Sequence, residues 1–229
     1  MEAGERRVDG RLIAWLTLVG VLAAANYLAR FGTETETVTR EAFYRWATVV
    51  GAGFQFGIML GLTLLIVRGD ARRLLALRRP RSWGQAAGIM VGIFVGVFVL
   101  SAIVTALGLR PGEEQGLTPE GWDSSRAVPF AANFVVAAAL VPLVEEFLFR
   151  GAGFSLLAQY GRGAAIVGTA ILFGVGHGLV EALPILVAFG LGLAWLRDRS
   201  NSVYPCILLH GLFNAISLIA AVTLGDRVA

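Results

Sequence analysis

The stretch VPLVEEFLFRG at residues 141–151 places three ionisable side chains, Glu145, Glu146 and Arg150, inside an otherwise apolar run. Ionisable groups inside a bilayer are costly and usually mark function. Glu146 and Arg150 are four residues apart, so on a helix they lie on one face and can form an ion pair. Glu145 is rotated from Glu146 by about 100° and can face another helix. The stretch therefore predicts a membrane helix with one paired and one available glutamate.

The composition of the whole chain supports a membrane location. The 229 residues are 56% hydrophobic and only 15% charged, with a mean hydropathy of +0.72, whereas soluble domains carry about 25% charged residues. The high hydrophobic content and low charge exclude a soluble domain and a disordered chain. Cys206 is the one cysteine, which excludes a disulfide scaffold. All 19 basic residues are arginines. They are spread along the chain, mostly over the predicted connections, and are not gathered into one basic face, so no nucleic-acid partner is expected.

Apolar runs of about 20 residues, the length that spans a bilayer, predict an all-α polytopic transmembrane bundle of about seven spans, seven to eight in all. The runs cover Leu12–Ala29, Trp46–Val67, Trp83–Leu109, Val128–Tyr160, two stretches that begin at Ala164 and Ala182, and Val203–Leu224. In the third run, Gly88, Gly92 and Gly96 recur at every fourth position. Small residues at this spacing predict close helix packing.

We expect the fourth helix to be long, because only then do its polar residues lie at the same membrane depth as those on the other helices. If it ended at Arg150, Glu145 would be about 7 Å from the membrane edge and His177 about 20 Å. If it continues to Tyr160, Glu145 lies about 22 Å deep, near His177 and near His210 at about 16 Å. We therefore expect a helix over 128–160, bent near Gly151 and Gly153, with Arg150 inside the membrane.

Arginines in short loops predict the orientation, because cytoplasmic loops carry the excess of basic residues. Those in the second connection are Arg68, Arg72, Arg73, Arg78, Arg79 and Arg81, those near the N-terminus are Arg6, Arg7 and Arg11, and those in later connections are Arg162, Arg197 and Arg199. The acidic connection with Glu113, Glu114, Glu120 and Asp123 then faces outward. We expect an integral protein of a prokaryotic plasma membrane, with its N-terminus in the cytoplasm.

Two further predicted helices carry polar residues at helical spacing. FGVGH contains His177 four residues after Phe173, and LHGLFN contains His210 four residues before Asn214. These spacings put each pair on one helix face. The three helices can therefore converge on a shared pocket with Glu145.

This set of side chains permits two kinds of hydrolytic chemistry. Glu145 and His177 can activate water as a general base, while His210 and Asn214 can donate hydrogen bonds to the oxyanion of a tetrahedral intermediate. Alternatively, Glu145, His177 and His210 are three zinc ligands that leave a fourth position for water. The expected cofactor is therefore either none or one zinc ion.

The pattern EExxxR, then FxxxH, then HxxxN across three membrane helices resembles the CPBP family, which includes type II CAAX prenyl endopeptidases and Abi or bacteriocin-processing relatives. The resemblance covers roughly Pro129 to Ala221, and the first three spans resemble nothing specific. All seven motif positions are filled, by Glu145, Glu146, Arg150, Phe173, His177, His210 and Asn214. We expect a three-span region at 1–127 and the catalytic core at 128–224 of a single membrane domain.

The resemblance implies an intramembrane endopeptidase that acts on membrane-embedded or lipidated proteins. It implies that Glu145 and His177 activate water, that His210 and Asn214 hold the oxyanion, and that Glu146, Arg150 and Phe173 support them. The family is often described as metalloproteases, although a metal-free glutamate mechanism has been proposed for its prenyl-processing branch. The resemblance fixes neither the natural substrate and its prenylation nor the metal dependence, the pathway and the oligomeric state.

Two other classes of protein would use the same polar residues. One is a non-catalytic bacteriocin-immunity or partner-binding protein, which would keep them for assembly. The other is a small proton-coupled transporter, which would use them as a proton relay. Replacing Glu145 by glutamine tests the protease interpretation against these two classes, because the substitution keeps the shape of the side chain and removes the base.

Overall fold

The computed structural model describes residues 9–32, 41–109 and 121–224. All regular secondary structure in these ranges is helical, which confirms the predicted all-α fold. The predicted orientation also rests on Arg6, Arg7, Glu113, Glu114 and Glu120, which lie outside the described residues.

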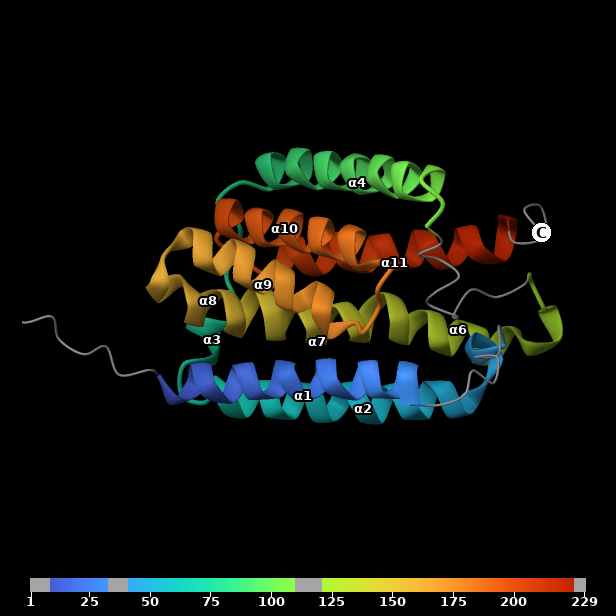
Figure 1. Cartoon of the computed structure of the whole chain (residues 1–229), viewed down its shortest axis with the longest axis horizontal. Coiled ribbons are helices and arrows are strands. Elements are labelled where there is room, and N and C mark those ends of the chain that lie inside the picture. The colour runs from blue at the N-terminus through green and yellow to red at the C-terminus, as the bar shows by residue number, and fades with distance from the viewer. Residues whose placement is uncertain (1–8, 33–40, 110–120, 225–229) are drawn as a thin grey trace, which may run out of the picture.

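Five helices are long and apolar enough to cross a membrane. They are α1 (Gly10–Gly32), α2 (Trp46–Ile66), α4 (Trp83–Ala106), the composite helix Ser124–Tyr160, and α11 (Tyr204–Leu224). The predicted fifth and sixth spans are α9 (Arg162–Gly176), which has 15 residues, and α10 (Leu183–Ser200), which has Arg197, Asp198 and Arg199 in its last turn. In this bundle, α4 lies on one side and α1 and α2 lie on the other (Figure 1).

Local sequence explains where these helices begin and end. Ser82 caps α4, because its hydroxyl oxygen accepts a hydrogen bond from the backbone N–H of Gln85 at 3.2 Å. Gly161 has a φ of 113° and separates the composite helix from α9. Asn201 has a φ of 55° and ends α10 in the left-handed conformation, which asparagine tolerates better than most residues. Short helices η1 (Ala42–Tyr44) and α3 (Ala71–Leu74) lie in the connections, and η2 (Ser124–Arg126) begins the composite helix.

The composite helix is the long fourth helix that the depth argument predicts. It consists of η2, α6 (Ala127–Val135), η3 (Val136–Leu140), α7 (Val141–Glu146), η4 (Phe147–Gly153), α8 (Phe154–Leu157) and η5 (Ala158–Tyr160). Segments η3 and η4 are π-helical, a rare geometry that is frequent at functional sites. Glu145 and Glu146 stand on the short α-helical segment between them.

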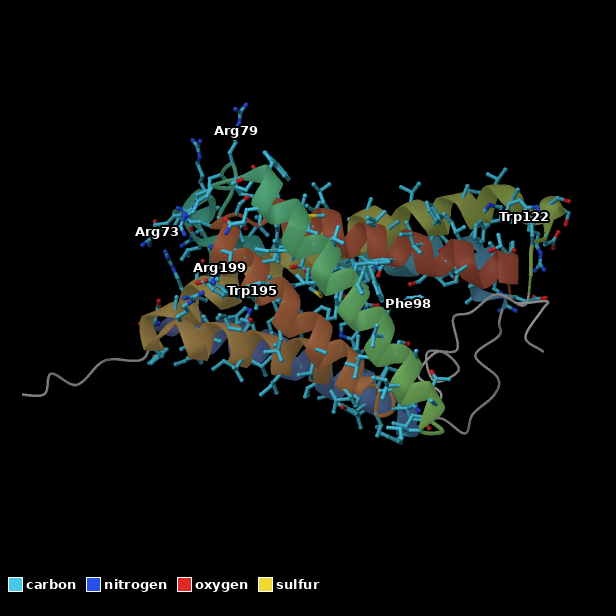
Figure 2. The ribbon with its side chains drawn as sticks, turned by 90° about the horizontal axis from the view of Figure 1, so that it is seen from above. Arg73, Arg79, Phe98, Trp122, Trp195 and Arg199 are labelled. Carbon is cyan, nitrogen blue, oxygen red and sulfur yellow. The ribbon has the colours of Figure 1, made fainter. Side chains whose placement is uncertain are left out.

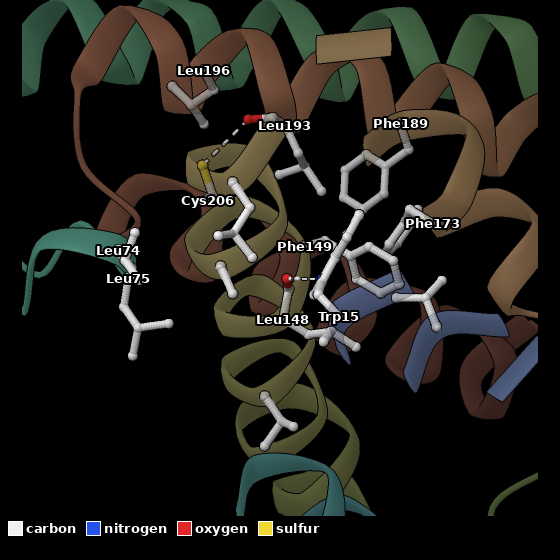
Figure 3. Close-up of a cluster of buried hydrophobic side chains, with 14 of the residues drawn as sticks. Trp15, Leu74, Leu75, Leu148, Phe149, Phe173, Phe189, Leu193, Leu196 and Cys206 are labelled. Atoms are coloured by element: carbon white, nitrogen blue, oxygen red, sulfur yellow. Dashed lines mark hydrogen bonds between the residues drawn. The ribbon is translucent and has the colours of Figure 1, made fainter. Parts of the chain in front are cut away.

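Side chains of the rest of the chain bond to the backbone of η3 and η4. The indole N–H of Trp15 donates to the carbonyl of Leu148 at 2.9 Å, Arg197 Nε donates to the carbonyl of Arg150 at 3.0 Å, and Asn214 Nδ2 donates to the carbonyl of Ala137 at 2.9 Å. Figure 3 shows Trp15 against Leu148 within the main cluster of buried apolar side chains. The two π-helical segments are thus held by tertiary contacts.

The glycines that matter for packing are not those that the sequence pattern indicated. Added Cβ atoms at Gly88, Gly92 and Gly96 would meet nothing within 4 Å among the described residues, so the predicted close packing at this stripe is wrong. A Cβ at Gly190 would instead lie 3.0 Å from the backbone of Ala170, and one at Gly192 would lie 2.7 Å from Ile93. A repeat of small residues allows close packing only where another helix lies against it. In the described residues, no helix lies against Gly88, Gly92 and Gly96.

Candidate active site

Glu146 and Arg150 form a completely buried ion pair, as the spacing predicts. The side chains are 0% exposed, and Arg150 Nη1 donates to Glu146 Oε1 at 3.0 Å. Arg150 Nη2 donates to the carbonyl of Gly190 at 3.1 Å, and the guanidinium lies 4.3 Å from the centre of the Phe173 ring. The pair therefore links the composite helix to α9 and α10.

His210 on α11 is the third member of this buried network. Its Nδ1 atom lies 2.8 Å from Glu146 Oε1, and the side chain is 5% exposed. The carboxylate accepts hydrogen bonds from both Arg150 and His210, so Nδ1 carries the proton. The Nε2 atom of His210 is then directed away from Glu146.

Glu145 faces both histidines. Its Oε2 atom lies 3.9 Å from His177 Nε2 and 3.8 Å from His210 Nε2, and its side chain is 12% exposed. Oε2 is buried and makes no hydrogen bond with any described residue. These three polar atoms therefore surround one small space. A water molecule there could donate hydrogen bonds to two of them, and it could accept one from His210 Nε2 only when that ring is doubly protonated.

The position of His177 is set by its own helix and by α1. Its Nδ1 atom lies 2.7 Å from the carbonyl oxygen of Phe173. A carbonyl oxygen only accepts, so Nδ1 carries the proton and the Nε2 lone pair of the neutral ring faces Glu145. Asn26 on α1 donates to the carbonyl of Gly176 at 2.7 Å, and Gly178, with a φ of 68°, packs against the Asn26 backbone.

Buried aromatic rings pack against the two histidines of this polar set. The centre of the Phe173 ring lies 4.6 Å from that of His177 and 5.8 Å from that of His210. Phe189 on α10 lies 5.4 Å from His210 at nearly a right angle. The site is thus polar at its centre and apolar around it.

Asn214 is near the site, but its amide bonds to the backbone. One of its N–H groups donates to the carbonyl of Ala137 in the π-helical segment η3. Pro142, four residues after Ala138, has no N–H to give to the Ala138 carbonyl, and Gly211 of α11 lies directly against that oxygen. The structure thus brings Glu145, Glu146, Arg150, Phe173, His177 and His210 together, while the position of Asn214 leaves its oxyanion role a prediction.

Four residues of the site have no signal in the sequence motifs. Trp15 and Asn26 lie on α1, far away in the sequence, and Phe189 is one apolar residue among many. The loop position expected for Arg197 is wrong, because its side chain is buried in α10 and bonds to the Arg150 carbonyl. Its cytoplasmic side stays a prediction. One signal could have identified the helical position: Arg197 directly continues the apolar run of α10, so it could have been assigned to the last turn of that helix and not to a loop.

The donor types of Glu145, His177 and His210 suit zinc, but their spacing does not fit a zinc centre. With bonds of about 2.0–2.2 Å, neighbouring ligand atoms in a tetrahedral site are about 3.4 Å apart, and here they are 3.8 and 3.9 Å apart. No group of three His, Cys, Asp or Glu side chains in the described ranges is arranged to hold a metal ion. Zinc on these residues stays a prediction.

Chemically, the site offers a carboxylate and an imidazole lone pair around one small space, next to a second imidazole that bonds to an ion-paired carboxylate. Such a set can bind a water molecule and can accept and return its protons. The second imidazole, when doubly protonated, can stabilise developing negative charge through Nε2. A base that binds water and a group that stabilises negative charge are what the hydrolysis of a peptide bond needs.

Comparison with known proteins bears on this arrangement. Residues 127–216 match the family model described as Type II CAAX prenyl endopeptidase Rce1-like. Neither the curated proteins nor the solved structures yielded a match to the chain. The matched residues include the composite helix from α6 onward, α9, α10 and the part of α11 that carries His210 and Asn214. Residues 127–216 are therefore similar to the Rce1-like type II CAAX prenyl endopeptidases, and this similarity points to a protease in general.

Proposed function

We propose that this protein is an intramembrane endopeptidase that hydrolyses peptide bonds of membrane-associated substrates with Glu145 as its general base. The observation that carries the proposal is the position of Glu145 Oε2, which is buried, has no hydrogen-bond partner among the described residues, and faces His177 and His210. A buried carboxylate oxygen without a partner is costly. A bound water that bridges the three side chains would supply the partner.

In this mechanism, Glu145 takes a proton from the water while His177 Nε2 accepts a hydrogen bond from the other O–H group. The hydroxide oxygen attacks the carbonyl carbon of the scissile bond, and Glu145 then gives the proton to the leaving amine. Both products leave with their protons balanced. His177 serves to orient the water, since its tautomer is set by the Phe173 carbonyl.

His210 stabilises the oxyanion through Nε2 when the ring carries a second proton. Glu146 supports this charge at Nδ1, in the same way that the aspartate of a serine-protease triad supports its histidine. Asn214 contributes the amide N–H that is not used on Ala137. Phe173 and the Glu146–Arg150 pair hold the rings and exclude water.

The substrate class follows from the position of the site. The catalytic residues lie on helices that are apolar on their outer surface, where Leu212 and Ile216 flank Asn214 on α11 and are exposed. A substrate therefore reaches the site from within the membrane or from a lipid anchor. The family description makes a prenylated C-terminal CAAX peptide the first substrate to test.

The first prediction is that Glu145→Gln and His177→Ala abolish cleavage. Purified variants in liposomes would be given a farnesylated CAAX peptide and an unmodified transmembrane peptide, with the products identified by mass spectrometry. Loss of general-base catalysis should lower the cleavage rate by about 10²–10⁴-fold. Glu41→Gln is the matched control, since the Glu41 side chain is 55% exposed and lies outside the site.

Cleavage by Glu145→Gln at the parent rate would contradict the proposal. The same assay after chelation tests the metal alternative: we expect activity to persist with less than about one tenth zinc per chain. Loss of activity on chelation, with recovery on adding zinc, would instead show that Glu145, His177 and His210 hold a metal.

A further inference from the structure

A second polar site lies at the end of the bundle where α3, α8, α9 and α10 meet. It is a cleft of about 470 Å³ whose lining includes six arginines and a single aspartate, Asp198. The arginines are Arg73, Arg78, Arg81, Arg162, Arg197 and Arg199. Ser155 on its wall is ten residues beyond Glu145, or about 15 Å along the helix, so the cleft is distinct from the candidate active site.

The acidic partners that the structure provides neutralise only part of this charge. Asp198 pairs with Arg162, and Arg73 pairs with Asp70 at 3.3 Å. Arg197 is buried and bonds to the carbonyl of Arg150. In the described part of the chain, no carboxylate pairs with Arg78, Arg81 or Arg199.

The wall of the cleft that carries Arg78 and Arg81 is fixed by backbone contacts with the end of α10. The N–H of Arg81 donates to the carbonyl of Ser200 at 3.0 Å, and the N–H of Val203 donates to that of Ala76 at 3.3 Å. The hydroxyl of Ser202 donates to the carbonyl of Arg78. These contacts join residues more than 100 positions apart and hold like charges close together.

Topology alone does not explain this convergence. Basic residues favour the cytoplasmic end of a bundle, but that rule requires only that they lie in the loops. Figure 2 shows Arg73 and Arg199 at the same end of the molecule as Trp195, while Arg79 extends away from the bundle. The Arg199 guanidinium lies 5.7 Å from the Trp195 ring, an arrangement typical of the membrane interface.

We propose that this cleft binds a phosphate-bearing anion, such as the head group of an anionic phospholipid. Guanidinium groups bind phosphate in a bidentate manner, and several of them around one space compensate the charge of a phosphodiester. Arg197 connects the cleft to the backbone of Arg150. An anion bound in the cleft would therefore contact Arg197, whose side chain holds the backbone of η4 next to the candidate active site.

The test compares two pairs of substitutions in one loop. Arg78→Gln/Arg81→Gln removes two arginines that line the cleft, and Arg72→Gln/Arg79→Gln removes the same charge from exposed positions that do not line it. Each purified protein would be titrated with phosphatidylglycerol against phosphatidylcholine in native mass spectrometry. We expect the first pair to weaken phosphatidylglycerol binding by about tenfold or more and the control pair to change it much less.

Equal weakening by both pairs, or by neither, would overturn the proposal, because the attraction would then be diffuse or absent. Arg199→Gln gives a second route to the same result if the double variant does not fold. Inorganic phosphate in the titration identifies the source of the anion: displacement of the lipid by phosphate points to a soluble phosphate, and persistence of the lipid points to a head group. Either result supports a phosphate site only where the cleft pair weakens binding selectively.

Discussion

Glu146 is the residue on which the geometry of the candidate site depends most, since both Arg150 and His210 bond to its Oε1 atom. The charges of Glu146 and Arg150 are compensated only by each other and by their hydrogen bonds, because both side chains are 0% exposed. Removing one partner of a buried pair leaves the other charge without compensation. We therefore expect the pair to position His210 rather than to react.

We expect Glu146→Gln to lower the free energy of unfolding by about 3–5 kcal/mol. The double variant Glu146→Gln/Arg150→Met should recover most of this loss, because no charge remains buried, but it should not recover activity. Chemical unfolding in detergent micelles measures the first effect, and peptide cleavage measures the second. A Glu146→Gln protein as stable as the parent would show that the pair carries no structural role.

At this scale, the sequence predicts the pair within one helix and the convergence of Glu145 with His177 and His210, but it does not indicate the bond between Glu146 and His210. The spacing of four residues predicts the Glu146–Arg150 ion pair, and the structure confirms it. The bond between Glu146 and His210 joins residues 64 positions apart. No spacing rule indicates it, because the facing of one helix toward another depends on the packing of the whole bundle.

At the scale of the element, the π-helical segment η4 is the feature that sets the direction of Arg150. Its Leu148 carbonyl accepts from Trp15, and its Arg150 carbonyl accepts from Arg197. Gly151 and Gly153 allow this packing, since a Cβ at Gly153 would overlap the Trp15 ring and one at Gly151 would lie 2.8 Å from Leu75. The depth argument predicts the length of this helix, but its π geometry depends on distant partners and has no local signature.

We expect Trp15→Phe to destabilise the protein by about 1–3 kcal/mol, because the Leu148 carbonyl would be buried without a donor. Activity should fall as well, since η4 contains Arg150. The matched control is Trp83→Phe on α4, whose side chain is 49% exposed. Unfolding and cleavage measurements on both variants test the role of the indole N–H, and equal effects of the two substitutions would contradict it.

At the scale of the whole molecule, the arginine-rich connections meet at one end of the bundle. Residues 68–81, the start of α9 and the end of α10 lie there, and Trp122 lies at the opposite end (Figures 1 and 2). Composition and run length predict seven spans, and five of them are described helices long and apolar enough to cross a membrane, while α9 is shorter and α10 ends in charged residues. Composition and run length do not predict the packing between spans, as Gly88, Gly92 and Gly96 show.

We expect the arginine-rich end to face the cytoplasm. Cys206 is buried, so single cysteines introduced at the exposed positions Ser82 and Ser124 can be labelled separately. In intact cells, a membrane-impermeant thiol reagent should label Ser124→Cys and should label Ser82→Cys only after the membrane is opened. The reverse pattern would invert the orientation, and the unsubstituted protein controls for reaction at Cys206.

The central claim is that Glu145, His177 and His210 surround a hydrolytic water. An experimental density map of the protein in lipid, at a resolution that resolves water molecules, tests it most directly. The account predicts a water-sized peak about 2.6–3.2 Å from Glu145 Oε2 and adjacent to the Nε2 atoms of both histidines. A peak about 2.0–2.2 Å from all three atoms would indicate zinc, and a Glu145 side chain turned toward the lipid would contradict the claim.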